Sequence, residues 1–228
     1  MQLASAPASI RPYSPLGLKL YDPFIVETLA PRVWRCPPQH IVSFYDRHVT
    51  ANHADLGVAT GYFLDRCDFG TPHPRLALID LQPHCLRYAA RRLARYAPAT
   101  YLRDALTPIV GIPGKPFDSI AIGGVLHCLE GDLQRKARVF DAIAPLAAAG
   151  TKVFGYTLLR DGVDSIMARL ARALLNLAGV VDNHNDTESD LRMALEARFA
   201  DVSIELSGCM ALFSAVVRHS HNSSGGLQ

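Results

Sequence analysis

The segment "HADLGVATGYFLDRC", residues 53–67, contains the pattern that decides the fold. An apolar run ends in a turn with two glycines, Gly57 and Gly61, and residues 60–67 are then expected to form a helix. Small residues in such a turn let the backbone approach a ligand, and the amides at the following helix N-terminus point toward it. The segment therefore predicts a strand, a ligand-binding loop and a helix in succession.

The spacing of the small residues argues against two other kinds of loop. The loop reads Asp55-x-Gly57-x-Ala59-x-Gly61. A dinucleotide loop, G-x-G-x-x-G, needs a small residue at position 62, which is Tyr62 here. A P-loop needs Gly-Lys followed by Ser or Thr, and no such triplet follows. We therefore expect a small ligand that is bound without a pyrophosphate turn.

Strands and helices alternate along the rest of the chain. Apolar runs predict strands at 54–57, 75–81, 100–104, 117–126 and 151–159. Helices are predicted at 83–97, where Arg92 is expected to be solvated, and at 131–150, where Gly150 would be the C-cap. Thr187 and Asp190 have capping-box spacing before a helix at 188–199, and residues 202–218 predict a hairpin. This order predicts an α/β fold, a Rossmann-like three-layer sandwich whose mostly parallel seven-stranded sheet ends in an antiparallel hairpin.

An N-terminal helical cap is expected before this sheet. Residues 1–17 are rich in Pro, Ser and Ala and predict a mobile arm. A helix should start at Asp22 as N-cap with Pro23 in its first position, and Phe24, Leu29 and Val33 should share a face. A second helix is expected at 37–49. We divide the chain into an arm and cap helix (1–40), a main domain (41–218) and a disordered tail (219–228).

Composition and charge narrow the function classes. The 228 residues carry a net charge of +2, 49% are hydrophobic and 19% are charged, which is typical of a soluble globular protein and does not indicate nucleic-acid binding. No apolar run reaches the ~18 residues that span a bilayer, and the N-terminus lacks a secretory pattern. The five scattered cysteines are expected to be reduced core thiols, and the nine histidines show no metal-ligand spacing. We expect a cytoplasmic protein with no metal and no membrane partner.

Residues 160–186 fit no strand–helix unit. Ile166, Leu170, Leu174 and Leu177 recur on one helical stripe. The favoured interpretation is a helix whose stripe packs on the core. A lid over a pocket is the second interpretation, because the insertion lies at the strand-end side of the sheet. A dimer helix and a membrane-surface helix rank third and fourth.

Two acidic residues stand at the ends of the next two predicted strands. Asp80 ends a strand where a carboxylate can accept both hydroxyls of a ribose. Asp104 ends the following one, where it can receive an adenine amino group. Each alone is more commonly an N-cap or a turn aspartate. With Asp55 they form a set at successive strand ends, which is where ligands bind in open α/β sheets.

This ordered set resembles that of the class I S-adenosylmethionine (SAM)-dependent methyltransferases. The matching segments cover roughly residues 40–160, and the terminal hairpin resembles the family's last two strands. The segments are "ADLGVATGYF", "ALIDLQPHCL", "YLRDAL", "FDSIAIGGVLHCLEG" and "APLAAAGTKVFGYTLL". The resemblance implies that residues 41–218 form a SAM-binding methyltransferase domain with a lid insertion at 160–186. It also implies SAM as cofactor and S-adenosylhomocysteine as product.

The resemblance further implies a role for each cofactor-binding residue. Asp55, Gly57, Ala59 and Gly61 are implied to border the methionine part of SAM. Asp80 is implied to bind the ribose, with Leu81 or Gln82 beside it. Asp104 and Ala105 are implied to lie near adenine, and Gly123 near the sulfonium end. Ala59 departs from the family's usual glycine. An added methyl is tolerated where the backbone is in an ordinary conformation, so we expect at most a mild loss of affinity.

Methyl transfer from a sulfonium is a direct displacement that chiefly requires the acceptor to be held in line. A carboxylate acceptor needs no base, whereas a phenol or an ammonium must lose a proton, which favours a nearby His or Tyr. His127, where the fourth strand leaves the sheet, is a candidate catalytic residue, and packing under the next helix is an equally weighted alternative. Tyr21 is a second candidate that closes over SAM or substrate, although a core aromatic is the commoner role. Tyr156 is similar.

A small-molecule acceptor is expected, because the fourth strand lacks the Asn/Asp-Pro-Pro-Tyr signature of many DNA and protein amide methyltransferases. We expect O-methylation of a natural product or a small acid, and a homodimer as a possible assembly. N- or C-methylation of a small molecule remains an alternative, as does a non-catalytic SAM-fold binding or partner module. A nicotinamide-dependent oxidoreductase is a third hypothesis, against which Tyr62 and the terminal hairpin argue.

Overall fold

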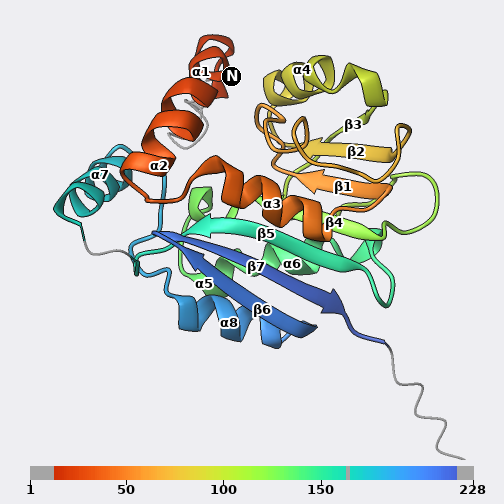
Figure 1. Ribbon diagram of the computed structural model, residues 1–228. Coiled ribbons are helices and arrows are strands. Elements are labelled where there is room, and N and C mark those ends of the chain that lie inside the picture. The colour runs from red at the N-terminus through yellow and green to blue at the C-terminus, as the bar shows by residue number, and fades with distance from the viewer. Residues whose placement is uncertain (1–12, 163–164, 220–228) are drawn as a thin grey trace, which may run out of the picture.

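The computed structural model describes residues 13–162 and 165–219. Within them, seven strands form one sheet in the order β3-β2-β1-β4-β5-β7-β6 (Figure 1). The strands are β1 (Asn52–Leu56), β2 (Arg75–Asp80), β3 (Ala99–Leu102), β4 (Ser119–Gly123), β5 (Lys152–Leu158), β6 (Phe199–Ser207) and β7 (Met210–Val217). β1 to β5 pair in parallel, and the hairpin of β6 and β7 adds to β5 in antiparallel fashion. The predicted α/β fold is confirmed.

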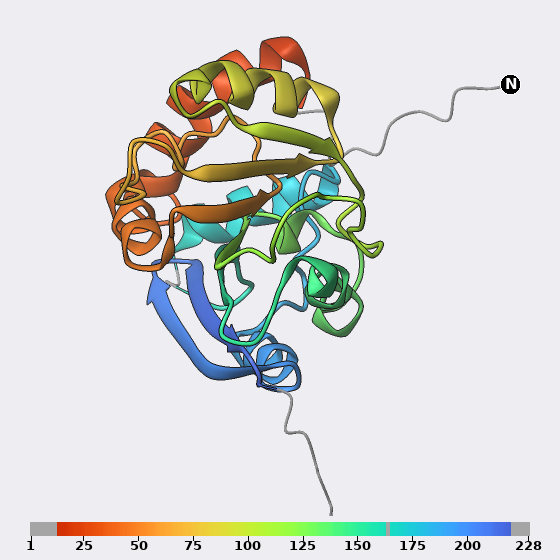
Figure 2. The ribbon, with the colours of Figure 1, turned by 90° about the vertical axis from the view of Figure 1, so that its right-hand side faces the viewer.

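Helices cover both faces of this sheet. One face packs on α3 (Pro38–His48) and α4 (Pro83–Arg92), and the other on α5 (Leu133–Lys136), α6 (Arg138–Ala142) and α8 (Glu188–Glu196). Successive residues of a strand point to opposite faces of the sheet. Leu78 and Ala121 therefore pack in the core on the side of α3 and α4, while Ile79 and Ile122 pack in the core on the side of α5, α6 and α8. Such strands read as continuous apolar runs. Figure 2 shows β3 and the β6–β7 hairpin at opposite edges of the sheet.

The cap begins earlier than predicted. Ser14 is the N-cap, because its side chain accepts a hydrogen bond from the amide of Gly17, and Pro15 occupies the first helical position. The chain then runs without a break through α1 (Pro15–Tyr21), the π-helical segment η2 (Asp22–Leu29) and α2 (Ala30–Arg32). The prediction of Asp22 as N-cap is therefore wrong. Residues 1–12 of the predicted arm, and 220–228 of the predicted tail, lie outside the described residues.

The face that the cap buries also differs from the prediction. Phe24 is 60% exposed, whereas Val26, Ala30 and Trp34 are buried. Leu29 and Val33 of the predicted face are partly buried and pack against the same core. Only Phe24 departs from the predicted face.

Two predicted helices are absent or broken within the described residues. Residues 60–67 form turns, in which Asp65 and Cys67 each donate an isolated bond four residues back. Here tertiary packing overrides helix propensity, since Phe63 stacks on Tyr45 and meets Tyr156 edge-on. Residues 131–150 divide into α5, α6 and the 3-10 turn η5 (Ala144–Leu146). Gly150 is not a C-cap but donates its amide to Val217 on β7.

The insertion contains α7 (Ile166–Leu177), and its predicted packing is wrong. Ile166, Leu170, Leu174 and Leu177 are 61–86% exposed. The opposite side of α7 faces the protein, through the buried Ala168 and through Ala171 and Leu175. Figure 1 shows α7 at the side of the molecule next to α2. The apolar stripe therefore faces outward, and small residues let the helix approach the core.

The segment after α7 is fixed to the body by buried polar groups. Lys136 on α5 forms an ion pair with Asp186, with 2.6 Å between Nζ and Oδ2, and both side chains are fully buried. Asn183 donates its side-chain amide to the carbonyl of Leu158 at 3.0 Å. Asp182 donates its backbone N–H to the carbonyl of His127 at 2.8 Å. These contacts hold the segment beside the end of β5. The predicted N-cap role of Thr187 is confirmed, since its hydroxyl oxygen accepts from the amide of Asp190. Asp190 completes the pair by accepting from the Thr187 hydroxyl.

Candidate active site

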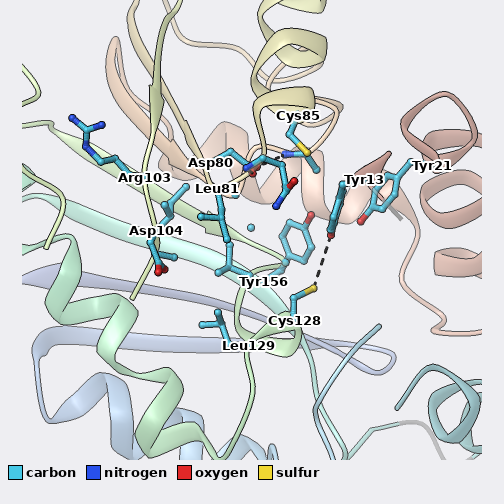
Figure 3. A pocket seen from close by; sticks show the side chains of 18 residues that line it. Tyr13, Tyr21, Asp80, Leu81, Cys85, Arg103, Asp104, Cys128, Leu129 and Tyr156 are labelled. Carbon is cyan, nitrogen blue, oxygen red and sulfur yellow. Dashed lines mark hydrogen bonds between the residues drawn. The ribbon is translucent and has the colours of Figure 1, made fainter. Parts of the chain in front are cut away.

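Two cavities adjoin at the carboxyl ends of the parallel strands. The strand-end cavity is bordered by the loops after β1, β2, β3 and β4 (Figure 3). It lies where the sheet order changes direction between β1 and β4, the usual ligand position in such folds. The cap cavity lies beside it and is lined mainly by apolar side chains of the cap, of α3 and of the segment after α7, together with His127.

Five residues border both cavities, and we call them the junction. They are Tyr13, Tyr21, Gly124, Cys128 and Tyr156. Tyr13 and Tyr21 come from the cap, with 5.7 Å between ring centroids, and the hydroxyl of Tyr13 lies 3.9 Å from the sulfur of Cys128. Figure 3 shows Tyr13, Tyr21, Cys128 and Tyr156 close together in the strand-end cavity. Because the cap cavity is bordered by the same side chains, a ligand in one cavity would meet a ligand in the other across them. The arrangement suits the transfer of a small group between two ligands.

Asp80 is held at the end of β2 by two backbone amides. Its Oδ1 accepts from Gln82 at 2.7 Å and its Oδ2 accepts from Ala59 at 3.3 Å. A carboxylate offers about four lone-pair positions, so capacity remains for further donors. Burial raises the pKa of Asp80 to about 6, and the two amides oppose that rise. The residue thus joins the first loop to the second strand end and offers free acceptor positions to the strand-end cavity.

The backbone at Ala59 is left-handed, with φ of +46°. This conformation favours glycine, because a Cβ approaches the following carbonyl oxygen. Our expectation of an ordinary conformation at this position is therefore wrong. The family's usual glycine has a conformational reason, and this chain carries alanine in a strained position that borders the strand-end cavity.

At three positions of the site, the structure shows why a residue larger than glycine would not fit. Gly57 has φ of +77°, and an added Cβ would lie 2.3 Å from the Val125 side chain. At Gly123 an added Cβ would lie 2.6 Å from the hydroxyl of Tyr45. Gly61 has φ of +70° and touches α4, where a Cβ would meet Ala89 at 3.2 Å. Gly61 therefore serves helix packing as well as bordering a recess.

That recess opens beside the strand-end cavity and contains Asp55. It is lined by Asp55 and Gly61 together with Gly57, Ala59, Gly123 and Tyr21. The hydroxyl of Tyr45 donates to Asp55 at 3.4 Å, and Nε2 of His53 lies 3.8 Å from its carboxylate. Burial raises the pKa of Asp55. The recess therefore brings a buried carboxyl group to within reach of a ligand in the first loop.

The residues after β2 and β3 form the outer wall of the strand-end cavity. Leu81 is 52% exposed and borders the cavity with Gln82, Asp104 and Ala105. Asp104 also acts as a turn aspartate, which was the alternative interpretation from the sequence. Its Oδ1 accepts a hydrogen bond from the amide of Leu106 at 2.9 Å. The structure thus brings together all the predicted cofactor-binding residues at this edge of the sheet.

His127 lies in η4 (Leu126–Cys128) and borders the cap cavity but not the strand-end cavity. Its Nδ1 accepts from the backbone N–H of Leu158 at 3.1 Å and lies 3.3 Å from the hydroxyl of Thr157. Burial, followed by the nearby Lys136 ammonium, lowers the pKa of His127 to about 4. The other candidate, Tyr21, lies across the junction with its pKa raised by burial.

Sequence reasoning missed three junction residues, Tyr13, Gly124 and Cys128. Tyr13 falls within the stretch interpreted as a mobile arm, and Cys128 was interpreted as a core thiol. The remaining cysteines, Cys36, Cys67, Cys85 and Cys209, are buried as expected. Arg92 was expected to be solvated, but its side chain is 20% exposed and pairs with Asp22 at 2.5 Å. No sequence pattern marks Tyr13, since its position follows from the path of the cap.

No family model matches the chain. The chain is 33% identical over 204 residues to demethylluteothin O-methyltransferase of Streptomyces thioluteus, covering 89% of this chain and 88% of that protein. It is 34% identical over 221 residues to methyltransferase ctvB of Aspergillus terreus, covering 94% and 96%. It is 32% identical over 208 residues to the physcion biosynthesis cluster O-methyltransferase of Aspergillus chevalieri, covering 90% and 92%. The chain belongs to the SAM-dependent O-methyltransferases.

Solved structures share the fold of this methyltransferase. Human N-acetylserotonin methyltransferase in complex with SAM has a TM-score of 0.63 at 15% identity, over 96% of this chain and 61% of that one. PigF with S-adenosylhomocysteine has a TM-score of 0.65 at 17% identity, over 93% and 63%. SAM is the cofactor of this methyltransferase. The free acceptor positions of Asp80 fit a ribose, and Gly57 and Gly123 border the same cavity.

The described residues also bear on membrane-spanning helices and on metal sites. No helix within residues 13–162 and 165–219 is long and apolar enough to cross a membrane. In the same ranges, no group of three His, Cys, Asp or Glu side chains is arranged to hold a metal ion.

Proposed function

We propose that this methyltransferase transfers the methyl group of SAM to an oxygen of an apolar natural product that binds in the cap cavity. The observation that carries the proposal is the pair of cavities that meet at the junction. One cavity offers Asp80 and the glycine-lined loop, and the other is walled by apolar side chains such as Val26, Leu29 and Trp34. A methyl group at the junction would face an acceptor in the cap cavity.

The roles that the family resemblance implies for the site residues are compatible with this placement. Asp80 would accept the ribose hydroxyls, with Leu81 and Gln82 beside it, and Asp104 and Ala105 would lie near adenine. Asp55, Gly57, Ala59 and Gly61 would border the methionine part, and Gly123 the sulfonium. Tyr21 would close the junction from the cap. Residues 160–186 would act as a lid, because Leu175, Val180 and Val181 line the cap cavity.

The names of the relatives support an acceptor of this class. Demethylluteothin O-methyltransferase is named for a natural product, and the Aspergillus chevalieri protein for a biosynthesis cluster. The apolar wall of the cap cavity agrees with such an acceptor, since small-molecule sites are mostly apolar with a few polar groups that fix orientation. A cytoplasmic location and a homodimer stay predictions.

Calorimetry with SAM and S-adenosylhomocysteine, followed by an acceptor screen, tests the proposal. The screen includes demethylluteothin and hydroxylated aromatic compounds, and release of S-adenosylhomocysteine is the readout. We expect SAM binding and turnover of at least one oxygen acceptor. A folded sample that binds no SAM would sink the proposal. SAM binding without turnover would favour the non-catalytic module, and methylation at nitrogen or carbon would favour the other alternative.

A matched pair of variants locates the acceptor. Ile25 lines the cap cavity, whereas its neighbour Phe24 does not and is 60% exposed. Ile25→Trp should fill part of the cavity, raise the KM for the acceptor and leave SAM affinity unchanged. Phe24→Trp should change neither quantity. Equal effects of the two variants on the acceptor KM would place the acceptor elsewhere.

A further inference from the structure

The hydrogen bonds of His127 decide which ring nitrogen carries its proton. The backbone N–H of Leu158 points at Nδ1 over 3.1 Å, and an amide N–H can only donate. Nδ1 must therefore present its lone pair, and the proton of the neutral ring resides on Nε2. The Thr157 hydroxyl, 3.3 Å from Nδ1, can donate to the same lone pair. Nε2 makes no hydrogen bond to the described residues, whereas Nδ1 makes both of these contacts.

The same contact opposes a second proton on the ring. An imidazolium would bring an N–H at Nδ1 against the N–H of Leu158. The buried Lys136, which pairs with Asp186, adds an unfavourable positive charge nearby. Burial and this charge lower the pKa of His127 to about 4. His127 is therefore a neutral ring that offers an N–H and keeps its lone pair occupied.

The polar side chains of the junction, which border the same cavity as His127, are donors as well. Burial raises the pKa of Tyr13, Tyr21 and Tyr156 above the usual range, so their hydroxyls keep their protons. Burial likewise raises the pKa of Cys128 to about 11. Among the described residues, no Asp, Glu, Lys or Arg side chain lines the cap cavity. An acceptor would thus meet hydrogen-bond donors and no ready base.

We propose that His127 donates its Nε2–H to the acceptor oxygen and orients it, and that this oxygen enters the cavity already ionised. The inference rests on the proposed function and deepens it. The oxygen–carbon bond forms while the sulfur–carbon bond breaks, so the oxyanion becomes a neutral methyl ether, or a methyl ester where the acceptor is a carboxylate, and the sulfonium becomes a neutral thioether. No proton moves in this step, because the acceptor has released its proton to solvent beforehand. The acceptors are therefore oxygen acids, such as carboxylic acids and acidic enols or phenols.

A matched pair of variants separates a donor from a base. Gln and Met are similar in size and neither is a base, but only Gln carries an amide donor. We expect His127→Gln to keep kcat/KM within about fivefold of wild type, whereas His127→Met should lose about 10- to 100-fold, the range for a lost hydrogen bond to a charged oxygen. Equal large losses in both variants would overturn the proposal. The affinity for S-adenosylhomocysteine should match wild type in both, which verifies folding.

A second measurement needs no acceptor. Nitrogen-15 NMR of histidine-labelled protein, in complex with S-adenosylhomocysteine, reports the tautomer of His127, and the His127→Gln spectrum assigns the signal. We expect the Nε2–H form at every pH between about 6 and 8. A proton on Nδ1, or titration of the ring in that range, would overturn the inference. If the wild type methylates no acceptor, the proposed function fails while this measurement still decides the state of His127.

Discussion

At the residue scale, Ala59 shows a local conflict between sequence and backbone. Its left-handed conformation costs an L-residue about 1 to 2 kcal/mol, and glycine would remove that strain. Glycine also raises the conformational entropy of the unfolded chain, which offsets about 0.4 to 1 kcal/mol of the gain in stability. We expect Ala59→Gly to raise the unfolding free energy by up to ~1 kcal/mol without loss of SAM affinity. Urea denaturation and calorimetry measure the two quantities.

Ala97 supplies the control for this prediction. It also has φ of +46° but lies outside the strand-end cavity. Ala97→Gly should give a similar gain in stability and leave SAM binding untouched. A lower unfolding free energy for Ala59→Gly would show that its backbone is not strained.

Asp80 links the affinity for SAM to pH. Burial raises its pKa to about 6, and a protonated carboxyl loses acceptor positions for the ribose hydroxyls. SAM affinity should therefore fall as the pH drops through about 6. Asp80→Asn should weaken SAM binding about 10- to 100-fold and remove this pH dependence. Asp104→Asn is the control, which should keep the pH dependence. Titration calorimetry across this range decides, and an unchanged pH profile in Asp80→Asn would contradict the assignment.

The effect of Asp80 on the stability of the free protein has the opposite sign. Its folded pKa of about 6 lies above the value of about 3.9 for an unfolded Asp. The contribution of Asp80 to stability is therefore fully present below about pH 4 and is lost as the pH rises through about 6. SAM binding and folding thus respond to the same proton in opposite directions.

At the element scale, Asp22 ties the cap to the first loop and to α4. Its Oδ1 accepts from the hydroxyl of Thr60 at 2.6 Å, and its Oδ2 pairs with Arg92 at 2.5 Å. The residue that was expected to start a helix instead lies inside one and connects three elements. Because Thr60 follows Ala59, this connection couples the position of the cap to the first loop, where we propose that the methionine part of SAM binds.

Removing this connection should weaken both stability and SAM binding. Asp22→Ala should lower the unfolding free energy by about 1 to 3 kcal/mol, because Arg92 is left partly buried without its partner. The double variant with Arg92→Ala should cost less than the sum of the two single changes. Urea denaturation of the four proteins tests this cycle. Additive costs would show that the pair contributes nothing of its own.

At the scale of the whole molecule, the exposed apolar stripe of α7 (Ile166, Leu170, Leu174 and Leu177) is the surface on which the predicted homodimer can be tested. Leu170 and Leu174 are 61% and 65% exposed, while Leu175 on the opposite side lines the cap cavity. Leu170→Glu with Leu174→Glu should leave monomer stability within about 0.5 kcal/mol, because the sites are exposed. We expect a wild-type dimer by light scattering and a monomer for the double variant. A wild-type monomer would contradict the homodimer prediction.

Leu175→Glu is the matched change on the inner side of α7. It should lower acceptor turnover and stability, because it places a charge against apolar side chains of the cap cavity. Wild-type turnover in this variant would argue against the lid role of residues 160–186.

The sequence by itself determined the sheet and the edge of it at which the candidate cofactor-binding residues gather. Apolar runs of strand length and the alternation with helices specify a parallel sheet, and parallel strands bring Asp55, Asp80 and Asp104 to one edge whatever the surrounding loops do. The hairpin and the capping box of Thr187 were equally local in origin, since both depend on residues a few positions apart.

Only the tertiary structure decided where the cap starts and what it contacts, how α7 is oriented, and which nitrogen of His127 faces the Leu158 amide. Tyr13 reaches the junction because the cap folds back over the strand ends, and α7 turns its large apolar stripe outward because small residues fit its inner side. The proton of His127 is fixed by the amide of Leu158, 31 positions away. These features depend on contacts between distant segments, which no local spacing in the sequence encodes.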